Sequence, residues 1–152
     1  MTKISLAKAL KLKNRMTGDL KTLETRVQSY NSNEKGRTVP YDGKSTYLES
    51  NALRMGIVHL KTTIQLANKP IEQEIIFLGE LKAEISFLSS VPTRKGVEIT
   101  VNYGKEITTE FIASISKEEI DAVIKELQSK IDDLQDKIDA HNATTMIEFP
   151  SI

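Results

Sequence analysis

Residues 97–141 read VEITVNYGKEITTEFIASISKEEIDAVIKELQSKIDDLQDKIDAH, and the spacing of their apolar residues changes once along this stretch. In the first part, apolar and polar residues alternate on both sides of Gly104, which is typical of two half-buried strands joined by a tight turn. In the second part, apolar residues recur every three or four positions, as on one face of a helix. The stretch therefore predicts a β-hairpin over about 97–115 and a long helix over about 117–142.

Three earlier segments carry the same helical spacing, over about 5–30, 46–68 and 70–90. Two helix starts are marked by a capping box, in which a Ser or Thr is followed three residues later by Glu. These boxes are Thr46-Tyr47-Leu48-Glu49 and Ser116-Lys117-Glu118-Glu119. We predict a mainly α fold, an antiparallel helical bundle of coiled-coil-like helices with one β-hairpin inserted before the C-terminal helix, in a single domain over residues 1–152.

Composition excludes several classes of protein. The 152 residues include 21 Lys plus Arg and 21 Asp plus Glu, so the chain lacks the basic surplus of a dedicated nucleic-acid binder. The absence of cysteine excludes disulfides and thiolate chemistry. The N-terminal residues lack the apolar segment of a signal peptide, and no run of about 18 apolar residues occurs. We expect a cytoplasmic protein with no nucleic-acid partner and no membrane association.

The apolar stripes predict self-association. Every predicted helix has one stripe, the third widens its stripe with Ile76, Phe77 and Phe87, and the hairpin is expected to present an apolar face of its own. A single copy would leave a large apolar patch exposed, and such patches usually mark interfaces. We expect a homo-oligomer, and the alternative is a monomeric bundle with an oversized core.

Motifs of catalysis are missing. The two histidines, His59 and His141, have no partner at metal-ligand spacing, and neither G-x-S-x-G nor H-E-x-x-H occurs. Gly43-Lys44-Ser45 matches the end of a P-loop, but Thr38 stands where the first glycine is required. We therefore expect no metal, no cofactor and no enzymatic activity.

Loop residues suggest a ligand site. The long polar segment over 31–44 precedes a predicted helix start, where free backbone N–H groups favour an anion. A second loop and the hairpin tip add cations and an aromatic ring. If copies bring these elements together, they form an interface pocket suited to a small anionic, nucleotide-like ligand; the alternative is a set of ordinary solvated loop residues. The candidate residues are Arg37, Tyr41, Lys44, Ser45, Thr46, Arg94, Lys95, Tyr103 and Lys105.

Three segments carry a resemblance to a known family. They are Ser5-Leu6-Ala7-Lys8-Ala9-Leu10, the hairpin followed by Ser116-Lys117-Glu118-Glu119-Ile120, and Ile138-Asp139-Ala140-His141-Asn142-Ala143-Thr144-Thr145. In these segments the chain resembles the septicolysin-like family of small, largely uncharacterised helical proteins. The resemblance implies a cytoplasmic helical oligomer with no established activity.

We expect a non-catalytic homo-oligomeric binding protein whose interface pockets sequester a nucleotide-like molecule, by analogy with phage proteins that act as sponges for signalling nucleotides. The alternative is a structural module that binds another protein and holds no small molecule. A hydrolase or transferase is the third class.

Overall fold

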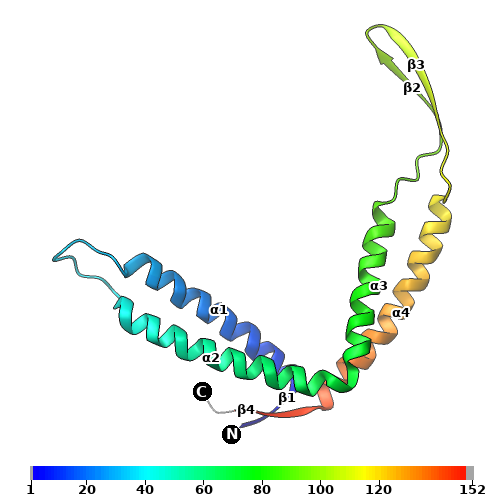
Figure 1. The fold of residues 1–152 in the computed structure, drawn as a ribbon. Helices are drawn as coiled ribbons and strands as arrows, with labels where there is room; N and C mark the ends of the chain where they lie inside the picture. Colours follow the sequence, from blue (N-terminus) through cyan, green and yellow to red (C-terminus); the bar gives the residue numbers. More distant parts are fainter. Residues whose placement is uncertain (1, 150–152) are drawn as a thin grey trace. The chain divides into compact units, whose positions relative to one another are not determined.

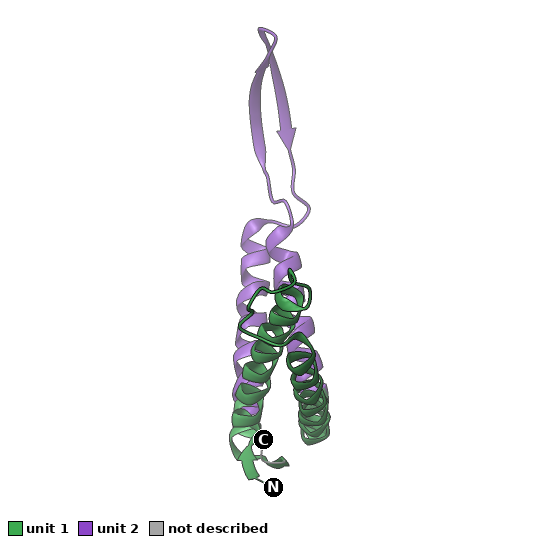
Figure 2. Cartoon of the chain, turned by 90° about the vertical axis from the view of Figure 1, so that its left-hand side faces the viewer, with its two compact units in different colours: residues 1–72, 139–152 green, residues 73–138 purple. Residues whose placement is uncertain are grey.

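The computed structural model describes residues 2–149 and confirms the mainly helical fold with a β-hairpin before the C-terminal helix (Figure 1). Contacts divide the chain into two compact units, residues 1–72 with 139–152, and residues 73–138 (Figure 2). The single domain over 1–152 stays a prediction, and its residues Met1 and 150–152 lie outside the described part of the chain.

The four predicted helices are all present. The structure adds one short strand before the first helix and another after the last. Within residues 2–149, every helix is too short or too polar to cross a lipid bilayer. The elements in chain order are β1 (Thr2–Ser5), α1 (Leu6–Tyr30), α2 (Gly43–Asn68), the 3-10 helix η1 (Lys69–Ile71), α3 (Glu72–Ser90), β2 (Gly96–Asn102), β3 (Lys105–Phe111), α4 (Lys117–Thr144) and β4 (Met146–Phe149).

The start of α2 differs from the prediction. Asp42 is its N-cap, because the Asp42 carboxylate accepts a hydrogen bond from the backbone N–H of Ser45 at 2.6 Å. The capping box predicted at Thr46 is wrong, since Thr46 lies within the first turn and its hydroxyl donates to the Asp42 carbonyl at 2.7 Å. Asp is as good an N-cap as Thr and occurs earlier in the chain, so the helix begins at Gly43 and not at residue 46.

The capping box at the start of α4 is confirmed. The backbone N–H of Ser116 donates to the Glu119 carboxylate at 2.7 Å, and the N–H of Glu119 donates to the Ser116 hydroxyl at 3.1 Å. These reciprocal bonds satisfy backbone groups that the helix cannot satisfy itself, and they fix its first residue at Lys117.

The first unit is built on the antiparallel pair α1 and α2 (Figure 1). Strand β1 pairs antiparallel with β4, so that Thr2 lies opposite Phe149 and Ser5 opposite Met146. The end of α4 is joined to α2 by His141, whose Nε2 lies 3.1 Å from the carbonyl oxygen of Ala67. The buried core of this unit consists of Leu6, Ala9, Met16, Ile57, Leu60, Ile64, Ile147 and Phe149.

The second unit is a pair of helices, α3 and most of α4, with the β2–β3 hairpin beyond their ends (Figure 2). Its buried core is small and consists of Leu81, Leu127 and Ile131, with half-buried Leu78, Ile85, Leu88 and Leu134 packed against it. These residues occupy one face of each helix, as the heptad spacing predicts.

The predicted extent of the hairpin, 97–115, is too long. Strand β3 ends at Phe111, which pairs with Gly96, the first residue of β2. Beyond that pair no strand residue remains for β3 to bond with, and the side chain of Ile112 is 89% exposed. The alternation of apolar residues therefore continues past the point where hydrogen bonding stops.

The apolar residues of the hairpin do not gather on a single face as expected. Register places Val97, Ile99 and Val101 opposite Glu110, Thr108 and Glu106 respectively. Directly opposite residues share a face, so each apolar side chain of β2 has a polar neighbour on β3. The apolar residues Ile107 and Phe111 of β3 lie on the other face, because a two-residue turn pairs odd positions with even ones.

Candidate functional site

A pocket beside the loop between α1 and α2 gathers one cation and several hydroxyl groups. The Arg26 guanidinium carbon lies 4.4 Å from the centroid of the Tyr41 ring, and the Tyr41 and Tyr30 rings are 5.6 Å apart. Arg26 and Tyr30 come from α1, while Tyr41 directly precedes the N-cap residue of α2. The pocket has a volume of about 310 Å³ and is lined by Thr22, Thr25, Arg26, Ser29, Tyr30 and Tyr41.

Donors and acceptors in this pocket can be assigned. The hydroxyls of Thr22 and Thr25 donate to backbone carbonyls one turn earlier, at 3.2 and 2.9 Å, and can therefore only accept from a ligand. The guanidinium of Arg26 and the hydroxyls of Tyr30 and Tyr41 remain as donors. No carboxylate lines the pocket among the described residues. This set favours an anionic group next to an aromatic or planar one.

A larger groove continues along the same two helices. Its volume is about 550 Å³, and it shares Thr22 and Arg26 with the pocket. Small residues on α2 make room for it: a Cβ atom added at Gly56 would lie 3.1 Å from the terminal methyl of Met16. Its lining residues are Met16, Asp19, Thr22, Leu23, Arg26, Glu49, Ala52, Leu53 and Gly56.

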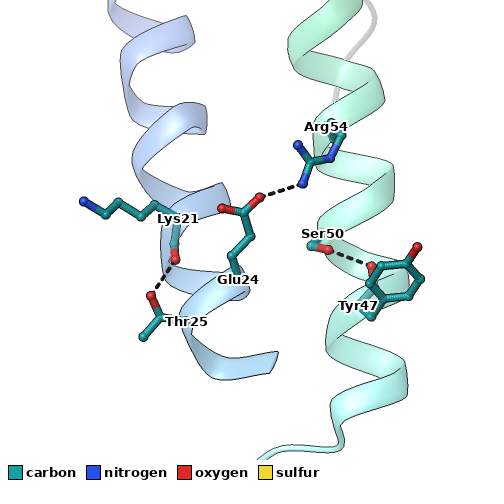
Figure 3. A network of polar contacts seen from close by, with 6 residues as sticks. All are labelled: Lys21, Glu24, Thr25, Tyr47, Ser50 and Arg54. Carbon is teal, nitrogen blue, oxygen red and sulfur yellow. Dashed lines mark hydrogen bonds and ion pairs between the residues drawn. The ribbon is translucent and has the colours of Figure 1, made fainter. Parts of the chain in front are cut away.

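One ion pair joins α1 and α2, and the neighbouring hydrogen bonds lie within each helix (Figure 3). The Arg54 guanidinium pairs with the Glu24 carboxylate at 2.6 Å, and both side chains are about half exposed. The buried hydroxyl of Ser50 donates to the Tyr47 carbonyl at 2.7 Å. Because Arg54 is already neutralised by Glu24, Arg26 is the cation of these helices that is placed to meet an anion at the pocket.

The candidates in the first unit do not form the predicted anion site. The Asp42 carboxylate already holds the N–H of Ser45, so the start of α2 presents a negative charge where an anion was expected. Thr46 is only 6% exposed and cannot reach a ligand. Tyr41 lies in the pocket beside Arg26, while Arg37 and Lys44 are exposed.

The candidates in the second unit are separated by the length of the hairpin. Arg94 and Lys95 precede β2, whereas Tyr103 and Lys105 lie at its turn. The seven residues of β2, at about 3.4 Å each, put roughly 24 Å between the two pairs, so one copy cannot use both on a small ligand. The Arg94 guanidinium also pairs with the Glu98 carboxylate at 3.0 Å, and its central carbon lies 4.8 Å from the centroid of the Phe111 ring.

Two carboxylates with lowered pKa values lie on α4, outside the pocket. Hydrogen bonds from the backbone N–H and hydroxyl of Ser116 lower the pKa of Glu119, and a hydrogen bond and the charge of Lys130 lower the pKa of Glu126. Both carboxylates are exposed and stabilise α4 itself. In the part of the chain that is described, no three His, Asp or Glu side chains are grouped as metal ligands.

Sequence reasoning missed most of the pocket. Arg26, Thr22 and Ser29 lie within a predicted helix, where polar residues are the ordinary solvated face. The signal that was available is their spacing, since residues three and four apart share a helix face. Only the contact between Tyr41 and Arg26 identifies that face as a pocket wall.

Comparison of the chain with protein-family models, with curated proteins and with solved structures finds no match.

Proposed function

We propose that this protein is a non-catalytic homo-oligomeric binding protein. Its copies associate through apolar helix faces, and the pocket beside Arg26 and Tyr41 binds a small anionic, nucleotide-like ligand and sequesters it. We also propose that the chain belongs with the septicolysin-like proteins that it resembles. The observation that carries the proposal is the amount of apolar side chain left exposed on α2 and α3.

Exposed apolar residues of α2 form a stripe. Leu48, Met55 and Leu66 are 59%, 67% and 67% exposed. They are seven and eleven residues apart, which are close to whole numbers of helical turns, so they lie on one side of the helix. The core residues of α2, such as Leu60, lie on another side. The helix therefore has an apolar face that its own chain does not cover within residues 2–149.

Helix α3 has a similar stripe. Ile76 and Phe87 are 60% and 65% exposed and lie eleven residues apart, on the side opposite buried Leu81. Soluble monomers seldom expose several large apolar residues together, and a second copy is the usual partner. These two stripes support self-association.

Pocket chemistry supports the ligand class. Arg26 offers a planar cationic donor, and the Tyr30 and Tyr41 rings offer stacking surfaces next to hydroxyl donors. A nucleotide carries a phosphate and a base on its sugar, and Arg26 suits the phosphate while the tyrosine rings suit the base. The pocket volume of about 310 Å³ lies at the small end of ligand sites.

The alternative is a protein-interaction module that binds no small molecule. It is favoured by two contacts that engage the predicted anion-binding groups. The Asp42 carboxylate accepts a hydrogen bond at the start of α2, and the Glu98 carboxylate pairs with Arg94. In that case the exposed helix stripes bind another protein, and the chain purifies with a stoichiometric partner.

Native mass spectrometry of the purified protein tests self-association and detects any retained small molecule. Calorimetry against cyclic nucleotides and ADP-ribose derivatives then tests the ligand class. We expect binding that weakens about tenfold or more in Arg26→Gln, because hydrogen bonds to charged groups contribute roughly 1.5–3 kcal/mol. The matched control Arg54→Gln should change affinity less than twofold, since Arg54 lies outside the pocket.

The proposal of a ligand fails if no compound gives heat at concentrations well above micromolar. A bound ligand that is recovered unchanged after prolonged incubation supports sequestration. Recovery of a product in its place would identify an enzyme and end the proposal of a non-catalytic protein.

A further inference from the structure

The β2–β3 hairpin has no packing partner within residues 2–149. Val97, Ile99 and Val101 are 64%, 61% and 70% exposed. Figure 2 shows the hairpin beyond the ends of α3 and α4. An isolated two-stranded hairpin is marginally stable in water, so a hairpin of this composition is expected to pair with another strand.

Turn geometry decides which backbone groups are free. Tyr103 and Gly104 have φ values of 48° and 76°, as in a type I′ turn, and the flanking residues Asn102 and Lys105 pair with each other. Hydrogen-bonded pairs alternate along an antiparallel ladder, starting from that pair. The backbone N–H and C=O groups that point away from the ladder therefore belong to Val97, Ile99 and Val101 on β2, and to Glu106, Thr108 and Glu110 on β3.

The free edge of β3 disfavours pairing with its own copy in the register centred on Thr108. An antiparallel pairing of two β3 strands around Thr108 would place Glu106 directly opposite Glu110 of the second copy, on both sides of the centre. Like charges directly opposite each other destabilise a sheet, and charged edges are a common defence against strand addition.

The free edge of β2 has the opposite character. The sequence Val97-Glu98-Ile99-Thr100-Val101 is nearly symmetric about Ile99. Pairing around Ile99 places Val97 opposite Val101 of the second copy and Ile99 opposite itself, with every free backbone group of these residues bonded. A register centred one residue earlier would bring Glu98 opposite Glu98 and is disfavoured.

We infer that β2 pairs antiparallel with β2 of a second copy, centred on Ile99, to form a four-stranded sheet. The six β-branched side chains then meet on one face of that sheet, which gives them the cross-strand packing that the single hairpin lacks. The inference rests on the proposed self-association and names the strand that carries it.

Pairing in this register also brings together the candidate residues that lie at opposite ends of one hairpin. Antiparallel strands bring the base of one hairpin beside the tip of the other. Arg94 and Lys95 of one copy then lie near Tyr103 and Lys105 of the second, and symmetry creates this cationic cluster twice. The separation of roughly 24 Å within one copy no longer applies.

Cross-linking tests the register, because the chain contains no cysteine and a single introduced thiol can form a protein–protein disulfide only with a second copy. In Ile99→Cys the two Cα atoms would be about 5.5 Å apart, within the range of a disulfide. Thr108→Cys is the matched control, since Thr108 lies directly opposite Ile99 on the same face of the same hairpin. In a glutathione redox buffer we expect Ile99→Cys to give several-fold more disulfide-linked dimer than Thr108→Cys.

Equal yields from the two variants, a higher yield from Thr108→Cys, or no dimer from Ile99→Cys would overturn the inference. Sedimentation of the unsubstituted chain separates this failure from that of the proposed function. An oligomer without the Ile99→Cys cross-link removes only the strand pairing, whereas a monomer at all concentrations removes self-association and the pairing together.

Discussion

Replacement of Gly56 by alanine measures how tightly α1 and α2 approach at the groove. Glycine within a helix is about 0.8–1 kcal/mol less favourable than alanine, so an unhindered substitution should stabilise the protein by that amount. At Gly56 the new Cβ would lie 3.1 Å from the Met16 terminal methyl, shorter than the 3.5–4.0 Å typical of carbon contacts.

The size of the effect follows from these two opposing contributions. The methyl group ends a flexible side chain and can move by a few tenths of an ångström, so the clash should remove only part of the gain. We expect Gly56→Ala to raise the free energy of unfolding by about 0.5 kcal/mol. Gly18→Ala is the matched control on α1, because a Cβ there meets nothing within 4 Å, and it should give the full gain of about 1 kcal/mol.

Urea unfolding followed by circular dichroism at one fixed protein concentration measures both variants, since self-association makes stability depend on concentration. In a Met16→Leu background, which removes the terminal methyl, Gly56→Ala should stabilise as much as Gly18→Ala does. A gain at Gly56 equal to that at Gly18 in the unaltered protein would refute the tight contact, and so would a difference that persists with Leu at position 16.

Two further predictions concern the core and the start of α4. Leu60→Ala should lower the free energy of unfolding by about 2–5 kcal/mol, because Leu60 is 0% exposed in the core of the first unit; a loss below about 1 kcal/mol in urea unfolding would contradict that burial. The stability difference between the unaltered chain and Glu119→Gln should depend on pH. Hydrogen bonds from Ser116 hold the pKa of Glu119 below its ordinary value of 4.5. The carboxylate therefore stabilises the folded state above pH 4.5 and loses this effect as the pH falls through the lowered pKa. Unfolding measured at neutral pH and at several acidic pH values checks the sign, and a difference that stays constant or grows on acidification would contradict it.

Local patterns predicted the helices well and failed where two signals competed. The Ser116 box started α4 as expected, because its two hydrogen bonds involve only neighbouring residues. At the start of α2 two capping residues were available, and the sequence does not say that Asp42 takes the N–H of Ser45. The anion site predicted there was lost for the same reason, since a side chain of the protein occupies it.

The spacing of residues along the sequence could not predict which distant segments pair with each other. Strand β1 pairs with β4, near the other end of the described chain, and neither segment has enough alternation to predict a strand by itself. The hairpin was predicted, but its faces were not, because a one-residue change of register moves every side chain to the opposite face.

The sequence by itself determined the helices, the hairpin and the exclusion of thiol chemistry, because helical spacing, turn residues and composition act through near neighbours along the chain. Only the tertiary structure decided that Arg26 lies over Tyr41 and that Gly56 opens a groove beside Met16. It also decided that the apolar residues of β2 share a face of the hairpin with Glu106 and Glu110. These features depend on which segments lie next to each other in space, and that choice is made by side-chain packing and strand register between residues that the local pattern does not connect.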